Sequence, residues 1–384
     1  MNLDAFSEFK TGRLVPITFH DRNDHAFIPS GLPPASIDYV SLYDLLLIAR
    51  VRLERLSAIS SQLPDVTLIL RPLQRREAIT SNSLEGTFVT PQELLLFEAA
   101  AAERAPSDQP EPRDDWREVF EYDRALRQGC EWIRANRLLD NSLICELHGL
   151  LLRASARGRE KSPGQFRAKQ VVVGRERRYF PPPATELAEL LANFEASLTP
   201  PPNVDPLVWA YIVHYQFEAI HPFEDGNGRI GRLVLALCAY KWLGLETPCL
   251  YMSEFFERNR KDYIQTLFRV STHGEWNEWV TLCLQGTIEQ AEASIRRCNA
   301  LRALKKRYED ALGADSGRPR ALLDGLFRQP FLSVVDVQKR FDVSYRAARN
   351  ALERLVGADI VREMQNHYPK TYVAQEIFNA AYVD

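Results

Sequence analysis

Apolar residues recur at helical spacing along most of the chain, and this pattern predicts a mainly α-helical protein. The positions Val40, Tyr43, Leu47, Val51 and Leu56 predict a first long helix within residues 37–61. Residues 116–307 read mostly as long helices. Within them, residues 206–220 are apolar around nearly the whole helical circumference, which predicts a helix buried at the centre of a bundle.

The chain before this core is less regular. The first 35 residues are rich in proline and glycine and lack helical periodicity, so we expect an irregular arm. A second helix is predicted over residues 73–84, ending at Gly86, and a third begins at Pro91. Residues 102–113 carry three prolines and several charges, which predict a surface linker.

One short stretch among the helices has β-strand character. Val171, Val172 and Val173 precede Gly174, and a run of three prolines follows at residues 181–183, so we expect a β-hairpin flap that ends at the prolines. The flap is either a surface excursion without a role or a lid that positions a substrate.

The C-terminal part predicts a winged helix-turn-helix. After a glycine-containing break at residues 313–318 come three short predicted helices, with Ser344 as the N-cap of the third, and two short strands. The sequence therefore predicts an N-terminal arm with a helical extension over residues 1–112, a helical core over 113–312 and the winged module over 318–384.

Composition limits the possible partners and compartment of the protein but does not identify its function. The 384 residues carry a net charge of −3, which gives no global attraction for nucleic acid or an anionic membrane. The six cysteines form no CxxC pair, as expected for a reducing compartment, and no stretch approaches the length of a membrane span. We therefore expect a cytoplasmic protein that makes no membrane contact.

The segment HPFEDGNGRIGR, residues 221–232, gathers the groups needed for phosphate chemistry. His221 follows the buried helix and precedes Pro222, which disfavours the α conformation at His221 and ends the helix there. An imidazole with an ordinary pKa of about 6.5 can accept a proton at neutral pH. His221 is therefore a candidate general base.

The loop after His221 suits an anion. Gly226 and Gly228 flank Asn227 and allow backbone N–H groups to approach a phosphate, and the next helix begins there with its positive end. Arg229 and Arg232 share one face of that helix, where an anionic ligand would compensate their charge. Asp225, beside the loop, fits a Mg²⁺ ligand that leaves most of the coordination to water and phosphate.

Each of these pieces alone is ordinary, since a loop with two glycines is usually a turn and a histidine before proline is often a helix end. No GxxxxGK(S/T) loop occurs, which excludes a Walker A site, and no HExxH or paired cysteines support zinc. The presence of the candidate base, the acid, the glycine loop and the two arginines within twelve residues favours a functional site.

The segment resembles the signature HxFx(D/E)GNGRxxR of the Fic family at every fixed position. The resemblance implies a Fic-type helical core, ATP as substrate and Mg²⁺ or Mn²⁺ as the metal. It assigns His221 as the base, Asp225 as the metal ligand and Asn227 as an α-phosphate contact. It also implies backbone contacts at Gly226 and Gly228, outer-phosphate contacts at Arg229 and Arg232, and a target-aligning role for the flap residues 171–173.

A second constellation precedes the core. Ser81 and Glu85 lie four residues apart on one predicted helical face, and Glu85 stands in the last turn, where the helix dipole disfavours a carboxylate by about 0.3 to 1 kcal/mol unless a cation is near. Solvent alone could satisfy Glu85. The segment resembles the Fic inhibitory motif (S/T)xxxE(G/N), which implies that Glu85 pairs with Arg232 and blocks the γ-phosphate position.

Two further regions leave alternatives open. Residues 253–263 resemble the stretch that closes the nucleotide pocket in Fic proteins, which places Asn259 and Tyr263 near adenosine, with a plain helical surface as the competing interpretation. Residues 318–384 hold ten Lys/Arg and eight Asp/Glu. This weak basic excess leaves DNA binding, protein docking and a homodimer contact as alternatives.

The resemblance implies a protein adenylyltransferase that transfers AMP from ATP to a serine, threonine or tyrosine hydroxyl of a target protein, itself included, under restraint by Glu85. One alternative is a de-AMPylase or a bifunctional enzyme. An alternative of another class is a DNA-binding regulator with a nucleotide-sensing Fic core, which Arg346 and Arg349 of the winged module would serve.

Overall fold

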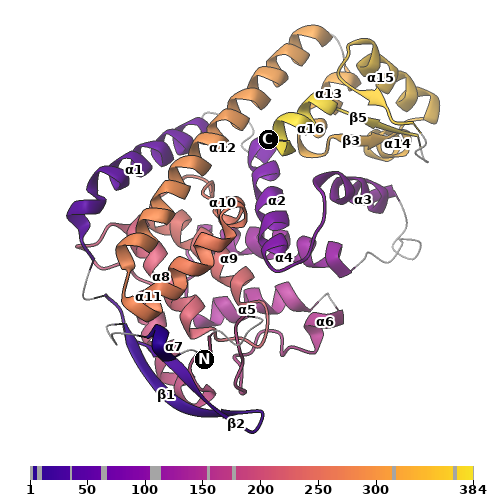
Figure 1. Ribbon diagram of the computed structural model, residues 1–384. Helices are drawn as coiled ribbons and strands as arrows, with labels where there is room; N and C mark the ends of the chain where they lie inside the picture. Colours follow the sequence, from indigo (N-terminus) through magenta and orange to yellow (C-terminus); the bar gives the residue numbers. More distant parts are fainter. Residues whose placement is uncertain are drawn as a thin grey trace.

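The computed structural model describes residues 3–6, 11–34, 37–61, 67–103, 114–153, 156–174, 179–313, 317–365 and 370–383. The predicted mainly helical fold is confirmed (Figure 1). The helices before residue 200 are η1 (Leu3–Ala5), α1 (Tyr39–Ser61), α2 (Thr67–Leu84), α3 (Pro91–Glu103), α4 (Asp114–Arg134), α5 (Asn141–Leu152), α6 (Ala156–Arg159), η2 (Ala184–Glu186) and α7 (Leu187–Ser197). Those of the second half of the core are α8 (Pro206–Ile220), α9 (Asn227–Trp242), α10 (Ser253–Arg258), α11 (Arg260–His273) and α12 (Trp276–Leu312).

The centre of the bundle is the packed pair of helices α8 and α9. Helix α8 has the bounds that its apolar sequence predicts, and 13 of its 15 residues are buried. Its N-cap is Asp205, whose side chain accepts a hydrogen bond from the backbone N–H of Leu207 at 2.8 Å. Helices α4, α5 and α7 pack around this pair, and the loop between α8 and α9 carries the segment HPFEDG, residues 221–226.

The N-terminal arm differs from the expectation of irregular structure. Strands β1 (Gly12–Phe19) and β2 (Arg22–Pro29) form an antiparallel hairpin that packs against α8. The turn residues His20 and Asp21 both have positive φ, the geometry of a tight hairpin turn, although neither is glycine. Pro16 within β1 and the polar residues at the start of β2 hide the alternation by which a strand is recognised.

The helices before the core follow the predictions with one extension. Helix α2 starts at Thr67, six residues before the predicted start, and continues through Pro72. Helix α3 starts at Pro91 as predicted. Most of the predicted linker, residues 104–113, lies outside the described residues.

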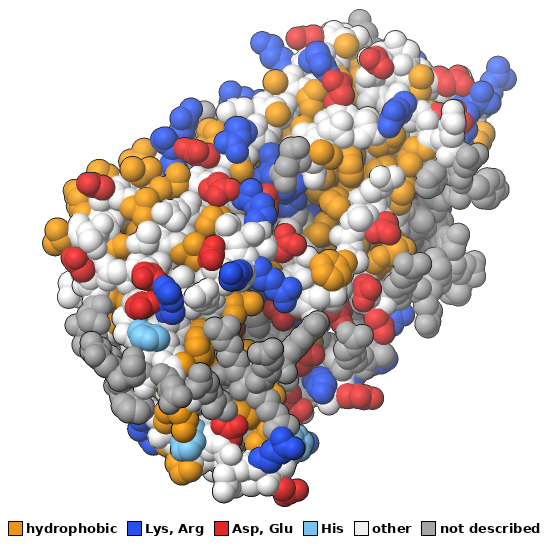
Figure 2. All heavy atoms as spheres, viewed as in Figure 1, with side chains coloured by type: hydrophobic (Ala, Val, Ile, Leu, Met, Phe, Trp, Pro, Cys, Tyr) orange, Lys and Arg blue, Asp and Glu red, His pale blue; other side chains and the backbone are white. Residues whose placement is uncertain are grey.

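Helix α1 packs along α12 and exposes apolar side chains on its outer face. Val40 is 87% exposed, and Tyr43, Leu47 and Val51 are also exposed. Figure 2 shows hydrophobic side chains along this flank of the molecule. The apolar spacing that predicts the helix therefore marks its outer side as well as its packed side.

The C-terminal module has the element order of a winged helix-turn-helix. Strand β3 was missed in the sequence because its three residues are too few to show alternation, and the final helix was also missed. Ser344 caps its helix as predicted, accepting from the N–H of Ala347. The elements are α13 (Arg318–Arg328), β3 (Phe331–Ser333), α14 (Val334–Phe341), α15 (Tyr345–Gly357), β4 (Arg362–Glu363), β5 (Thr371–Val373) and α16 (Gln375–Tyr382), with the antiparallel sheet order β3-β5-β4.

The winged module is held directly on α2. The guanidinium of Arg76 donates to the backbone oxygen of Tyr382 at 2.9 Å, and that of Arg75 donates to the backbone oxygen of Arg328 at 2.5 Å. Gln329 donates to the backbone oxygen of Leu95 on α3 at 3.0 Å. Helix α2 therefore contacts both the core and the winged module.

Candidate active site

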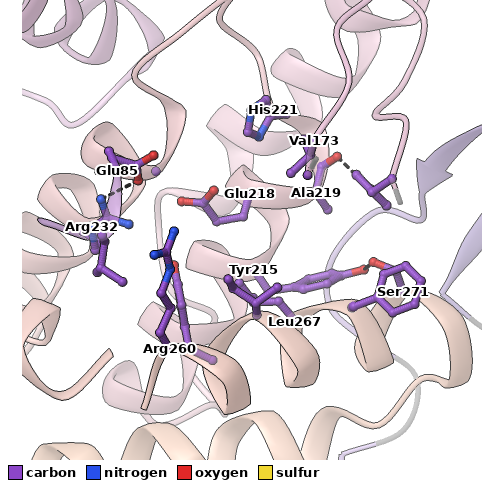
Figure 3. A pocket seen from close by; sticks show the side chains of 17 residues that line it. Glu85, Val173, Tyr215, Glu218, Ala219, His221, Arg232, Arg260, Leu267 and Ser271 are labelled. Carbon is purple, nitrogen blue, oxygen red and sulfur yellow. Dashed lines mark hydrogen bonds and ion pairs between the residues drawn. The ribbon is translucent and has the colours of Figure 1, made fainter. Parts of the chain in front are cut away.

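A cavity of about 340 Å³ opens beside the end of α8 (Figure 3). Its walls come from α2, α8, α9, α11 and the flap. Of the residues proposed from sequence it is lined by Glu85, Val173, His221, Gly228, Arg232 and Tyr263. Helices that are far apart in sequence thus bring the candidate base His221, the glycine loop and Glu85 to one cavity.

His221 occupies the C-cap of α8 in a left-handed conformation, with φ 50° and ψ 62°. This conformation is uncommon for a residue with a side chain and persists only where neighbours hold it. Arg167 does so, because its Nε donates to the backbone oxygen of His221 at 2.8 Å and its own N–H donates to the oxygen of Pro222 at 2.9 Å. The same guanidinium binds the backbone oxygens of Lys169 and Pro182, at the two bases of the flap.

Burial lowers the pKa of His221 from its ordinary 6.5 to about 4, and the positive charge of Arg167 adds to this effect. The imidazole is therefore neutral at pH 7 and has a nitrogen lone pair available. Figure 3 shows its ring at the rim of the cavity that holds the Glu85–Arg232 pair. A bound phosphate would bring negative charge near the ring and raise this pKa towards neutrality.

The anion loop is shaped by the side chain of Asn227. Its Oδ1 accepts from the N–H of Phe223 at 2.8 Å, and its Nδ2 donates to the oxygen of Phe223 at 2.9 Å. Gly226 has φ 77° and precedes the first turn of α9, whose N–H groups have no acceptor within the helix. Asn227 is 2% exposed, so in this conformation its amide closes the loop rather than facing the cavity.

We expect Asn227→Ala to destabilise the fold, because it leaves the backbone N–H and C=O of Phe223, a buried residue, without these partners. Each unsatisfied buried group costs about 1 to 3 kcal/mol. Chemical denaturation should show the free energy of unfolding reduced by about 2 kcal/mol or more. An unchanged midpoint would contradict the structural role of the amide.

His148 supports the same loop and was missed in the sequence. Its Nδ1 accepts from the N–H of Gly164 at 2.9 Å, so the proton of the neutral ring lies on Nε2, which donates to the oxygen of Asp225 at 3.0 Å. The ring stacks on Phe223 at 3.8 Å between centroids. Burial lowers the pKa of His148 to about 4, which keeps the neutral form that this geometry requires.

Arg232 is the most constrained cation at the cavity. Its guanidinium donates to the hydroxyl of Ser81 at 2.9 Å, to the backbone oxygen of Ser81 at 2.8 Å and to the carboxylate of Glu85 at 2.7 Å. Burial raises the pKa of Glu85, but the charge and hydrogen bond of Arg232, together with the charge of Arg229, outweigh this and the net pKa is lowered. The ion pair implied by the resemblance is thus formed between α9 and the residue that follows α2.

The two ends of this pair differ in exposure. The Arg232 side chain is 3% exposed, whereas that of Glu85 is 39% exposed. A Cβ at Gly228 would collide with the Glu85 carboxylate, so glycine is needed at this position for Glu85 to reach over the loop. Glu85 can therefore leave towards solvent, while Arg232 would keep its contacts with Ser81.

Arg229 does not line the cavity. It is 4% exposed and pairs with Glu118 of α4 at 3.0 Å, and Thr87 donates to the same carboxylate at 2.9 Å. Its assignment to the outer phosphates remains a prediction. In this conformation Arg229 ties α9 to α4 and to the segment after α2.

Asp225 is the residue available for a metal ion. Its side chain is 39% exposed, and its Oδ1 accepts from the N–H of Gly226 at 2.7 Å. In the described part of the chain, no three histidine, cysteine, aspartate or glutamate side chains are grouped as metal ligands. A single accessible carboxylate at a phosphate loop fits Mg²⁺, which keeps several waters and takes phosphate oxygens as ligands.

Glu218, one turn before His221, also lines the cavity and was not singled out in the sequence. Burial raises its pKa to about 7, and one carboxylate oxygen is buried without a hydrogen-bond partner among the described residues. Figure 3 shows this carboxylate between the Glu85–Arg232 pair and His221. The Glu218 carboxylate is therefore a polar group that can contact a ligand in the cavity.

The remaining predicted residues divide between the cavity and its surroundings. Tyr263 lines the cavity and its hydroxyl lies 3.0 Å from Nε2 of His214, whereas Asn259 bonds the oxygen of Phe255 and lies outside the lining. In the flap, Val173 and Tyr179 exchange both backbone hydrogen bonds, at 2.9 and 3.3 Å. Val171 and Val172 do not line the cavity, and the flap tip, residues 175–178, lies outside the described residues.

Comparison with known proteins agrees with this geometry. The fold and the loop define a helical protein with a glycine-containing loop at the start of a central helix. The sequence model of the Fic/DOC family matches residues 138–239, and that of the Fic/DOC family N-terminal region matches residues 43–131. The chain belongs to the Fic/DOC family, with the N-terminal region of that family before the core.

Solved structures support the fold. A Fic family protein from Desulfovibrio desulfuricans G20 has a TM-score of 0.57 at 20% identity, covering 89% of this chain and 98% of that one. A Fic domain containing signaling protein from Bacteroides thetaiotaomicron has a TM-score of 0.52 at 17% identity, covering 66% of this chain and 97% of that one.

Curated relatives match over a shorter stretch. The protein adenylyltransferase Fic of Drosophila melanogaster is 40% identical over 74 residues, which is 19% of this chain and 14% of that protein. The corresponding protein of Culex quinquefasciatus is 39% identical over the same length, with the same coverage. The match therefore spans about one seventh of these relatives. No helix among the described residues is long and apolar enough to cross a membrane.

Proposed function

We propose that this protein transfers AMP from ATP to a hydroxyl group of a protein. The observation that carries the proposal is the shared cavity of His221, Gly228 and Arg232, which combines a neutral base, a glycine-lined helix start and a buried cation. The names of the curated relatives, protein adenylyltransferase Fic, support AMP as the group transferred.

In the proposed reaction, a serine, threonine or tyrosine hydroxyl of the target lies beside His221, between the flap and the loop. The imidazole accepts the hydroxyl proton while the oxygen attacks the α-phosphorus of ATP. The bond from that phosphorus to the bridging oxygen of the β-phosphate breaks, and pyrophosphate leaves. The protein contributes mainly position and electrostatic stabilisation, as is general for phosphoryl-type transfers.

The chain's own groups have separate tasks in this step. The N–H groups at the start of α9 and the charge of Arg232 receive the phosphates. Arg167 is a positioning residue, since it holds the backbone of His221 and both bases of the flap. Asp225 would hold Mg²⁺ or Mn²⁺, which would neutralise phosphate charge when bound.

Intact-mass spectrometry tests the nucleotide assignment. The protein is incubated with Mg²⁺ and an equimolar mixture of the four ribonucleoside triphosphates, and the mass added to the protein is determined. We expect an adduct of the mass of AMP. An adduct of another nucleotide or of a single phosphate would replace the proposed reaction with that one.

The pKa of His221 gives a direct prediction. Because its folded-state pKa is lowered to about 4, the ring should stay neutral as the pH falls from 8 to 5.5, whereas an ordinary histidine titrates near 6.5. Nuclear magnetic resonance of ¹³C-histidine-labelled protein, with the signal assigned by its loss in His221→Gln, measures this. A titration midpoint between 6 and 7 in the nucleotide-free protein would contradict the burial argument.

Glu85 is proposed to restrain the reaction. A nucleotide whose outer phosphate binds Arg232 must displace the carboxylate that now occupies this cation. One guanidinium cannot serve both ligands in full, and the balance depends on the difference in their affinities. The half-exposed position of Glu85 supports displacement by ligand rather than a permanent contact.

A second candidate is the reverse process, removal of AMP from a modified protein. It rests on the lowered pKa of Glu85, which keeps this carboxylate ionised beside the same cavity as His221. An ionised carboxylate can orient a water towards the phosphorus. If wild-type protein strips AMP from its own modified form and Glu85→Gln does not, removal belongs to this site; equal rates would exclude that role.

A further inference from the structure

A second cavity, of about 570 Å³, lies between α2, α3 and the winged module and is separate from the candidate active site. Figure 1 shows α3 directly beside α14 and β3, with α2 to their left. No residue of its lining is shared with the first cavity. The cavity also contains none of the groups proposed for AMP transfer.

The lining of this second cavity is strongly basic. Its charged residues include two carboxylates, Glu98 and Asp336. Asp336 is already used in the capping box of α14, where it exchanges hydrogen bonds with Ser333. The five cations of the lining are Arg71, Arg75, Arg328, Lys339 and Arg340.

Arg75 provides a buried group that points to a ligand. It is 6% exposed, and its other two nitrogens bind Glu98, the oxygen of Arg328 and, at 3.4 Å, the hydroxyl of Tyr382. Its Nε is buried and has no hydrogen-bond partner among the described residues. A buried donor on a cation is costly unless an acceptor satisfies it.

Neighbouring acids pair with two of the five cations. Arg71 pairs with Asp123 at 2.7 and 2.8 Å, and Arg75 pairs with Glu98. Burial, together with the negative charge of Asp123, raises the pKa of Glu98 despite the two arginines beside it. On the opposite wall, Lys339 and Arg340 of α14 are exposed.

We propose that this cavity binds a small polyanion that carries phosphate groups, held by Arg75 and Arg71 on one wall and by Lys339 and Arg340 on the other. The concave shape and the volume of about 570 Å³ suit a small molecule. The backbone of a DNA duplex would not reach Arg75, which is 6% exposed beneath the winged module.

The site is placed to influence Glu85. Arg75 lies on α2 and Glu85 directly follows the end of this helix at Leu84, ten residues away, which corresponds to about 15 Å at 1.5 Å per residue. The polyanion would contact both α2 and α14. It would therefore bind most tightly when these two helices have one particular position relative to each other. Any ligand with this preference changes the population of arrangements of α2.

Isothermal titration calorimetry with sodium pyrophosphate, in the absence of Mg²⁺, tests the site in the full-length chain. The test variant is Lys339→Gln with Arg340→Gln, which removes two cations from the cavity wall. The matched control is Arg346→Gln with Arg349→Gln, which removes two cations from exposed residues of the same module outside the cavity lining. Thermal unfolding checks that both proteins fold.

We expect the test variant to weaken pyrophosphate binding about tenfold or more, as for the loss of charge-assisted hydrogen bonds, and the control to change it less than twofold. Binding should persist in Arg232→Gln, whose substitution lies in the other cavity, and in His221→Ala, whatever its AMP transfer activity. Equal weakening in both double variants, or loss of binding in Arg232→Gln alone, would overturn the proposal. Displacement of pyrophosphate by duplex DNA would assign the surface to nucleic acid instead.

Discussion

Replacement of His221 by alanine should reduce AMP transfer by about 10² to 10⁴-fold, the range of a general base. The reason is that His221 is the histidine that lines the cavity, and its lowered pKa keeps it neutral at pH 7. The initial rate of label incorporation from α-³²P-labelled ATP measures the effect. Nucleotide binding should change little, because the phosphates are assigned to the loop and Arg232.

His273→Ala is the matched control, since His273 is an exposed histidine at the end of α11 outside the cavity lining. It should retain full activity. The His221 assignment fails if the His221→Ala protein labels at the wild-type rate, or if both substitutions lower the rate alike.

Replacement of Glu85 by glycine should raise self-labelling about tenfold or more. Hydrogen bonds to charged groups contribute about 1.5 to 3 kcal/mol, and solvent exposure of Glu85 reduces this towards the lower limit. A nucleotide no longer has to displace the carboxylate from Arg232, so the phosphates bind that cation at lower cost. The measurement is the rate of mass increase with ATP and Mg²⁺.

Glu257→Gln is a suitable control for this prediction. Glu257 accepts a hydrogen bond from Ser83 at 2.9 Å, near the same end of α2, but it does not contact Arg232. Its substitution should leave labelling unchanged. If Glu85→Gly labels no faster than wild type, or if Glu257→Gln activates as strongly, the contact between Glu85 and Arg232 is not the restraint.

Local sequence predicted the parts of the site that lie close together in the chain. The bounds of α8, the helix end at His221 and the glycine loop all follow from apolar periodicity, proline and glycine within 27 residues, 206–232. The pairing of Glu85 with Arg232 came from a resemblance rather than from spacing. The physical signal for it was a carboxylate in the last turn of a helix, which calls for a cation.

The supporting residues could not be predicted because their partners are distant in sequence. The hydrogen bonds join residues that are far apart in sequence. Arg167 and His221 are 54 residues apart, His148 and Asp225 are 77 apart, and Glu118 and Arg229 are 111 apart. No local period marks such contacts. A buried charge or imidazole in an otherwise apolar helix is the available signal, and it becomes informative only when the packing is known.

The N-terminal hairpin shows the opposite failure, in which local signals misled. Pro16 lies inside β1, and the turn uses His20 and Asp21 where glycine or asparagine is usual. The pairing is stabilised by tertiary contacts, such as the bond from the N–H of Phe27 to the oxygen of Phe180 at 2.9 Å. Packing against the core therefore overrides a weak strand pattern.

The most direct test of the central claim compares two labels in the Glu85→Gly protein. One reaction contains α-³²P-labelled ATP and the other contains γ-³²P-labelled ATP, both with Mg²⁺, and the radioactivity that stays on the protein is counted after denaturing electrophoresis. AMP transfer predicts protein-bound label from the α position and none from the γ position. Label from the γ position, or no label from either, would contradict the account.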